Sequence, residues 1–177
     1  MKKLQKTTKV TMLLIAIAAS LFACKKEDTS TSSGSIPANG WRIGTTNYTT
    51  ALAMRNVGMP NSIGAFDAVP SANNLNSVVV LFNNVSGIAA GTFKVVFKAN
   101  QSDLLADEII VGASTGYNQS TGQYNKQYAT VPGETVNATV TITGGKAKIV
   151  IPQINIVAYP ATPSSPTTTF AGTIQEL

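Results

Sequence analysis

A strand–turn–strand pattern near the C-terminus constrains the fold most strongly. In residues 136–143, Val-Asn-Ala-Thr-Val-Thr-Ile-Thr, apolar residues alternate with Thr and Asn over four periods. Gly144 and Gly145 follow, and the alternation resumes over residues 146–151, Lys-Ala-Lys-Ile-Val-Ile. A type I′ turn needs positive φ at two successive residues, which glycine adopts without strain. The segment therefore predicts a β-hairpin with one face in a core.

A similar alternation of β-forming runs with turn-forming residues continues through the chain from Gly40 onward. Short runs rich in Val, Ile, Thr, Phe and Tyr lie between clusters of Gly, Asn, Pro and Ser. They predict strands at 41–43, 47–54, 77–82, 91–98, 108–111, 136–143, 146–151, 154–158 and 169–174. The apolar run 77–82 suits a central strand covered on both faces. In 91–98, Phe93, Val95 and Phe97 are expected to point inward.

Two stretches of the chain predict other structure. Residues 56–74 are rich in Pro, Gly and Asn and predict a long loop. Residues 103–108 suit a single helical turn with Ser102 as its cap. About nine antiparallel strands then remain, which predict an all-β domain, an antiparallel β-sandwich. A meander closing into a lipocalin-like barrel is the alternative.

The N-terminus has the pattern of a secretory signal. Four lysines, at positions 2, 3, 6 and 9, precede an apolar run over residues 11–23. This run is shorter than the roughly 20 residues that span a bilayer. The following Leu21-Phe22-Ala23-Cys24 resembles the lipobox of bacterial lipoproteins, and Cys24 is the only cysteine in the chain.

The lipobox resemblance implies a processing and anchoring scheme. In that family the cysteine thiol takes a diacylglycerol, the signal is cut before the cysteine, and the new amine is acylated. Residues 1–23 would then be the signal peptide, 24–39 an acylated tether, and 40–177 a single β domain. The implied partner is membrane lipid, reached through fatty acyl chains on Cys24, because two or more chains anchor stably where one does not.

Short motifs in the domain resemble those of small Bacteroidetes lipoproteins, in which no catalytic residues are established. The motifs are Gly40-Trp41 with Gly44 and Tyr48, then Gly91-Thr92-Phe93, and a terminal strand at 170–174. The resemblance implies an outer-membrane location. Residues 25–28, Lys-Lys-Glu-Asp, also resemble the surface-export signals of that phylum, and a plain flexible tether explains them equally well.

Charge and missing residue types exclude several classes of function. Four of the 13 basic residues lie before Cys24, which leaves nine against eight acidic residues. The mature chain is nearly neutral and offers no basic surface for nucleic acid. Histidine is absent and no second cysteine is present. Catalytic triads, Cys-His dyads and His-ligated or thiolate metal sites are therefore excluded, and we expect neither an enzyme nor a cofactor or metal site.

The segment 117–128 is the leading candidate for ligand binding. Tyr117, Tyr124 and Tyr128 stand there among amides and hydroxyls. Tyrosine offers an apolar plate and a polar tip, which suits a glycan or protein ligand. A solvated hairpin whose tyrosines cover a sheet edge is the competing interpretation. Trp41 is a further candidate, although packing under the first hairpin explains it as well.

The acidic residues allow a second hypothesis. A carboxylate-based hydrolase of glycan or peptidoglycan would need two of these to converge in a cleft: Asp67, Asp103, Asp107, Glu108 and Glu134. A carrier of hydrophobic ligands would instead need a barrel with an apolar cavity. The favoured hypothesis is a non-catalytic domain that binds a ligand or partner at the cell envelope.

The lipobox makes one direct prediction. Replacing Cys24 by Ser removes the thiol that accepts the lipid, so the chain should accumulate as an unprocessed precursor. Metabolic labelling with an alkyne analogue of palmitate should mark the wild type and leave the variant unlabelled. Label on the Cys24→Ser chain would contradict the assignment.

Overall fold

In the described residues, eleven strands are arranged in two crossing layers. The computed structural model describes residues 35–162 and 165–177, so Cys24 and residues 25–34 lie outside the described part. The strands are β1 (Gly40–Ile43), β2 (Thr46–Thr49), β3 (Leu52–Arg55), β4 (Ser62–Phe66), β5 (Leu75–Phe82), β6 (Gly91–Val95), β7 (Glu108–Asn118), β8 (Gln123–Thr130), β9 (Asn137–Thr143), β10 (Lys146–Ala158) and β11 (Thr167–Gln175).

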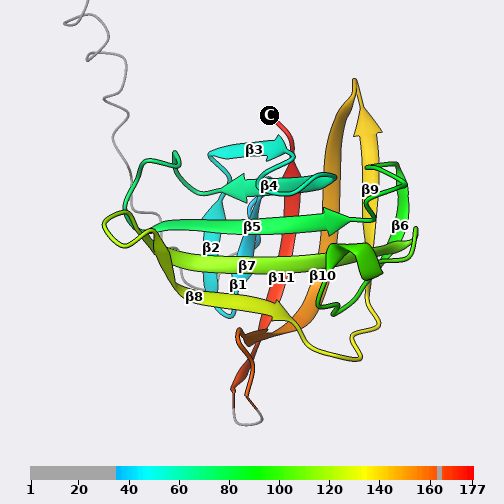
Figure 1. Ribbon diagram of the computed structural model, residues 1–177. Coiled ribbons are helices and arrows are strands. Elements are labelled where there is room, and N and C mark those ends of the chain that lie inside the picture. Colours follow the sequence, from blue (N-terminus) through cyan, green and yellow to red (C-terminus); the bar gives the residue numbers. More distant parts are fainter. Residues whose placement is uncertain (1–34, 163–164) are drawn as a thin grey trace, which may run out of the picture.

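Figure 1 shows how the layers are arranged: β3, β4, β5, β7 and β8 form the front layer, and β2, β1, β11, β10 and β9 form the back. The strands of one layer run across those of the other, which is the orthogonal form of sheet packing. The all-β, sandwich-like prediction is confirmed. The sheet is mixed rather than wholly antiparallel, because β6 pairs with β7 in parallel.

Backbone pairing joins the layers at two corners. At one corner β6 lies between β9 and β7, and at the other β8 pairs with both β7 and β10. Five strands therefore form a closed ring, in the order β10, β9, β6, β7 and β8. The space between the layers is filled by one hydrophobic cluster, in which Trp41, Phe82 and Phe170 have no exposed surface. The interior is thus a packed core.

The hairpin that dominates the sequence pattern forms as predicted. Gly144 and Gly145 have φ values of 58° and 78°, as a type I′ turn requires. Val140 and Ile149 of the two strands are register partners and both are buried. Beyond Ile151 the pairing of β10 with β11 shifts at a bulge, so the strands expected at 146–151 and 154–158 form one strand that bends at Pro152.

Two predictions about the N-terminal half are wrong in detail. The expected strand 47–54 divides into β2 and β3, which lie in different layers. The chain crosses between the layers at Thr50 and Ala51. The N–H of Thr50 donates to the carbonyl of Asn39 at the back layer, and the N–H of Ala51 donates to the carbonyl of Phe66 in the front layer. The expected long loop 56–74 contains the buried strand β4. Its flanking residues Asn56 and Asn61 adopt positive φ, which Asn tolerates.

Two smaller predictions are also corrected. The helical turn lies at Gln101–Asp103, earlier than the expected 103–108, and is a single 3₁₀ turn. Phe97 does not point inward, because β6 ends at Val95 and leaves its side chain 38% exposed. Within the described residues, no helix has the length and hydrophobicity needed to cross a membrane.

Asn39, the last residue of the expected tether, is attached to the domain. Its side-chain amide bonds both main-chain groups of Gln175, at 3.2 Å and 3.0 Å. Ile36, Pro37 and Ala38 lie over the outer face of the back layer, against residues of β10 and β11. The segment that leads toward Cys24 therefore reaches the domain on its back layer.

An ion pair also ties the two layers together, between the end of β3 in the front layer and the residue that follows β11 in the back layer. Arg55 at the end of β3 holds both carboxylate oxygens of Glu176 with its Nε, at 2.8 Å and 2.9 Å. Glu176 also accepts the N–H of Ala147, at 2.5 Å, and Arg55 donates to the carbonyl of Gly145, at 2.7 Å. Burial acts to raise the pKa of Glu176, and these hydrogen bonds more than offset it, so its pKa lies below the ordinary value.

A second carboxylate stabilises the bend of β10. Glu134 accepts the N–H of Asn155 at 2.8 Å, where β10 has left β9 and not yet joined β8. That hydrogen bond is the main cause of a lowered pKa at Glu134, opposed by partial burial and reinforced by the N–H groups of Thr135 and Val136. Glu134 thus satisfies the main-chain N–H of Asn155, which neither β9 nor β8 reaches.

The Arg55–Glu176 pair predicts a pH-dependent stability. Glu176→Gln keeps the side-chain shape and removes the charge, so the free energy of unfolding at pH 7 should fall by about 2 kcal/mol. A lowered folded-state pKa gives stability that is present above the ordinary Glu pKa of about 4.3 and is lost as pH falls through the folded value. The difference between wild type and variant in urea denaturation, followed by Trp41 fluorescence, should therefore shrink below about pH 4.

Asp103→Asn is the matched control for this measurement. Asp103 is exposed and bonds only neighbouring side chains, so its variant should lie within about 0.5 kcal/mol of wild type at pH 7. Equal stability of wild type and Glu176→Gln at pH 7 would contradict the role of the pair.

Candidate functional site

The clearest candidate site is a groove on the outer face of the front layer. Its volume is about 650 Å³, and residues of β5, β7 and β8 form its floor. Val79, Gly112 and Ala129 stand side by side across the three strands, with Leu81 and Ile110 in the next row. These residues are only partly covered, so a mostly apolar floor is open to solvent.

The sequence of two strands explains why this floor is apolar. In β5 the residues Val78, Val80 and Phe82 point into the core and are at most 1% exposed. Successive side chains of a strand point to opposite faces, so Val79 and Leu81 point outward. The same alternation in β7 buries Ile109 and turns Ile110 outward. The continuous apolar runs therefore supply both a core face and a groove floor.

Gly112 deepens the middle of the groove, because it places no side chain on the floor. A Cβ placed there would lie 3.5 Å from a methyl of Val79, an ordinary contact distance. No other described side chain fills this space, and Gly112 is not among the glycines with positive φ. The position therefore tolerates a larger residue, and the glycine leaves the groove open between β5 and β8.

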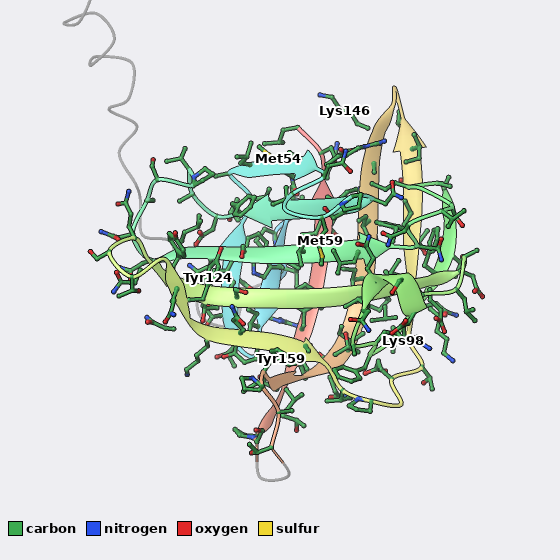
Figure 2. The ribbon with its side chains drawn as sticks, viewed as in Figure 1. Met54, Met59, Lys98, Tyr124, Lys146 and Tyr159 are labelled. Carbon is green, nitrogen blue, oxygen red and sulfur yellow. The ribbon has the colours of Figure 1, made fainter. Side chains whose placement is uncertain are left out.

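The groove walls come from three segments outside the sheet. Residues 97–102 line one side, with Met59 and Pro60 beside them, and Tyr159 stands at the β8 end. Figure 2 shows Met59, Lys98 and Tyr159 around this face. Gln101 fixes the wall: it is 6% exposed, and its Nε2 donates to the carbonyls of Pro60 and Phe82, at 2.6 Å and 2.7 Å.

Exposed apolar side chains surround the groove. Met59 is 46%, Phe97 38% and Tyr159 55% exposed. The polar side chains at the rim are amides and hydroxyls, with one charge at Lys98: Asn84, Asn100, Ser102, Ser114 and Gln127. Such a site buries apolar groups of a ligand and leaves rim amides for its polar groups. These residues were not predicted from the sequence, although the outward apolar positions of β5 and β7 were a signal for them.

The carboxylates of the hydrolase hypothesis lie outside the groove and outside the two smaller hollows of the described residues. No Asp or Glu lines this groove or either of two smaller hollows. Asp67 accepts the main-chain N–H and side-chain amide of Asn76, and Glu108 accepts the N–H of Leu105 and lies 3.8 Å from Lys98. Glu134 stabilises the bend of β10. No group of potential metal ligands occurs in the described part of the chain.

Two of the candidate tyrosines form a pair at one end of the β7–β8 hairpin. Tyr117 and Tyr124 are register partners with ring centroids 5.1 Å apart, and both are half-buried. The hydroxyl of Ser77 donates to the Tyr124 hydroxyl at 3.1 Å. These contacts fix the two rings against each other and against β5, away from the groove floor.

The other two candidates contribute to the core, and Tyr128 is also among the residues that line the groove. Tyr128 packs against the hydrophobic cluster, and Trp41 is fully buried and stacked on Tyr48 at a centroid distance of 5.5 Å. Burial raises the pKa of Tyr48, and the charges of Tyr128 and Asp67 add to the rise. Trp41 has no surface left for a ligand.

The comparisons with known proteins add no further constraint. The chain matches no protein family model, and no curated protein or solved structure is significantly similar to it.

The placement of the tyrosines predicts unequal effects on stability. Tyr128→Ala removes a half-buried ring from the core and should lower the free energy of unfolding by about 2 kcal/mol. Tyr117→Ala removes one ring of an aromatic pair and should cost about 1 kcal/mol. Urea denaturation of the two variants checks the order. A Tyr128→Ala loss under about 0.5 kcal/mol would assign Tyr128 to solvent.

Proposed function

We propose that this chain is a lipoprotein of the bacterial outer membrane whose β domain binds a protein partner in the groove on its front layer. The lipobox Leu21-Phe22-Ala23-Cys24 and the charged and apolar regions before it support the anchor. The open apolar floor of the groove is the observation that supports binding.

A protein partner suits the groove better than a glycan does. The floor is built from aliphatic side chains of β5, β7 and β8, which accept apolar side chains of a ligand. The amides at the rim, Asn84, Asn100 and Gln127, are exposed and match main-chain groups of a polypeptide. A glycan would instead use Phe97 and Tyr159 as stacking plates, and this remains the second candidate.

The position of the N-terminal segment is compatible with anchoring. Ile36, Pro37 and Ala38 lie over the back layer, whereas the groove lies on the outer face of the front layer. The described residues of this segment, 35–38, therefore do not cover the groove. The packed interior, with Trp41 and Phe170 fully buried, supports an external site over an internal cavity for a hydrophobic ligand.

Site-specific crosslinking in whole cells tests this function. A photo-crosslinking p-benzoylphenylalanine in place of Ser114 at the groove rim should give one defined adduct. The same group in place of Thr141, exposed on β9 of the back layer, should give none. Gly112→Leu fills the floor and should reduce the adduct at least tenfold, while Gly112→Ala leaves space and should change it less than twofold.

The nature of the adduct decides between the candidates. A protein partner requires that mass spectrometry of the proteinase-digested adduct finds peptides foreign to this chain, and a digest that yields only peptides of this chain would favour glycan or lipid. Equal adducts at positions 114 and 141, or an adduct unaffected by Gly112→Leu, would contradict the groove as the binding site.

A further inference from the structure

We propose that the free edge of β8 is a second binding site, which accepts an extended acidic peptide as an added strand. This inference goes beyond the groove, because it rests on the backbone of residues 123–127 and not on the apolar floor.

The edge of β8 is only partly occupied. Its whole length pairs with β7 on one side, but β10 pairs on the other side only at Tyr128, Ala129 and Thr130. The last bond of that ladder runs from the N–H of Tyr159 to the carbonyl of Gln127, at 2.8 Å. Beyond it, no element of the described residues pairs with the β8 residues 123–126 on that side.

Strand geometry fixes which groups are free. The main-chain N–H and C=O of one strand residue point to the same side, and the side alternates along an antiparallel strand. Since the Gln127 carbonyl points toward β10, the main-chain groups of Gln123 and Asn125 point that way as well. Five residues of strand present about 16 Å of edge at about 3.3 Å per residue.

A hollow of about 450 Å³ lies beside this edge. Its lining consists of residues 122–127 of the β7–β8 turn and β8, together with Ala158 and Tyr159. An extended peptide placed there would continue the line of β10 and satisfy the free main-chain groups. Only a polypeptide backbone repeats donors and acceptors at this spacing, so strand addition is the recognition mode that the edge fits.

The charge and the shape of the surface beside the β8 edge limit the kinds of partner that can bind there. Lys126 is exposed and is the one charged residue in the lining of the hollow, so a carboxylate on the added strand would face it without competition. In Figure 1 the segment that follows β10 projects past the edge of β8. A single extended peptide fits beside that projection, whereas the sheet of a second copy would clash with it.

Removing one main-chain donor tests the proposal. Asn125→Pro deletes an N–H that points to the free edge and leaves the ladder to β7 intact, and Asn125→Ala keeps that N–H. The probe is a fluorescein-labelled peptide, Thr-Val-Glu-Val-Glu-Thr, added to the acylated full chain in detergent and followed by fluorescence polarisation. We expect Asn125→Pro to weaken binding at least tenfold, Asn125→Ala less than twofold, and Lys126→Glu at least threefold.

The outcomes separate this site from the groove. Gly112→Leu should leave peptide binding within twofold of wild type, and Asn125→Pro should leave the Ser114 crosslink unchanged. Absence of peptide binding to the wild type, or equal binding by Asn125→Pro and Asn125→Ala, would overturn the proposal. A dimer of the free chain in sedimentation that Asn125→Pro dissociates would assign the edge to a second copy and would also overturn it.

Discussion

The long strand β10 belongs to both layers, and the closure of the core depends on it. Its first half pairs with β9 and its last residues pair with β8, while β11 follows it on the other side. No thiol is present in the described chain to lock the layers covalently. The layers are therefore held by this shared strand, by the parallel contact of β6 with β7, and by the core between them.

The bulge in β10 is what allows one strand to serve two layers. Ile149 and Ile151 point into the core, and so do Ile154 and Ile156, all at most 2% exposed. The step from Ile151 to Ile154 is three residues, which would place the two on opposite faces of a regular strand. The exposed pair Pro152 and Gln153 absorbs the odd residue at the bulge, so the strand bends and keeps its apolar side inward.

Local patterns of the sequence predicted the parts of the fold that are locally determined. Gly144-Gly145 between two alternating runs specifies its turn through backbone freedom alone, and the hairpin forms as expected. The prediction of one strand over 47–54 was wrong, because the strand divides at Thr50 and Ala51. That division depends on hydrogen-bond partners far away in sequence, Asn39 and Phe66. Strand β4 was missed because Asn and Gly around a short apolar run indicate a loop until β5 is placed beside it.

The groove depends even more on distant parts of the chain. Its floor joins strands near residues 80, 110 and 129, and its wall is a segment fixed by the buried amide of Gln101. The sequence did contain one signal: the run 77–82 is apolar at every position from Val78 to Phe82, which led to the expectation of cover on both faces. The structure covers the inner face fully and the outer face only in part, so the surplus of apolar residues marks the open floor.

A nearly neutral domain recognises its partners at short range. With nine basic against eight acidic residues from Cys24 onward, and with Arg55 already paired to Glu176, little net field extends beyond a Debye length to steer a ligand. The affinity of the two proposed sites must then come from buried apolar area in the groove and from main-chain hydrogen bonds at the β8 edge, both of which act only on contact. Tyr159 and Gln127 line both hollows, so a ligand in one lies within reach of the other. Contacts of this kind change the dissociation rate more than the association rate, and changes at Gly112 or Asn125 should therefore act through the lifetime of the complex.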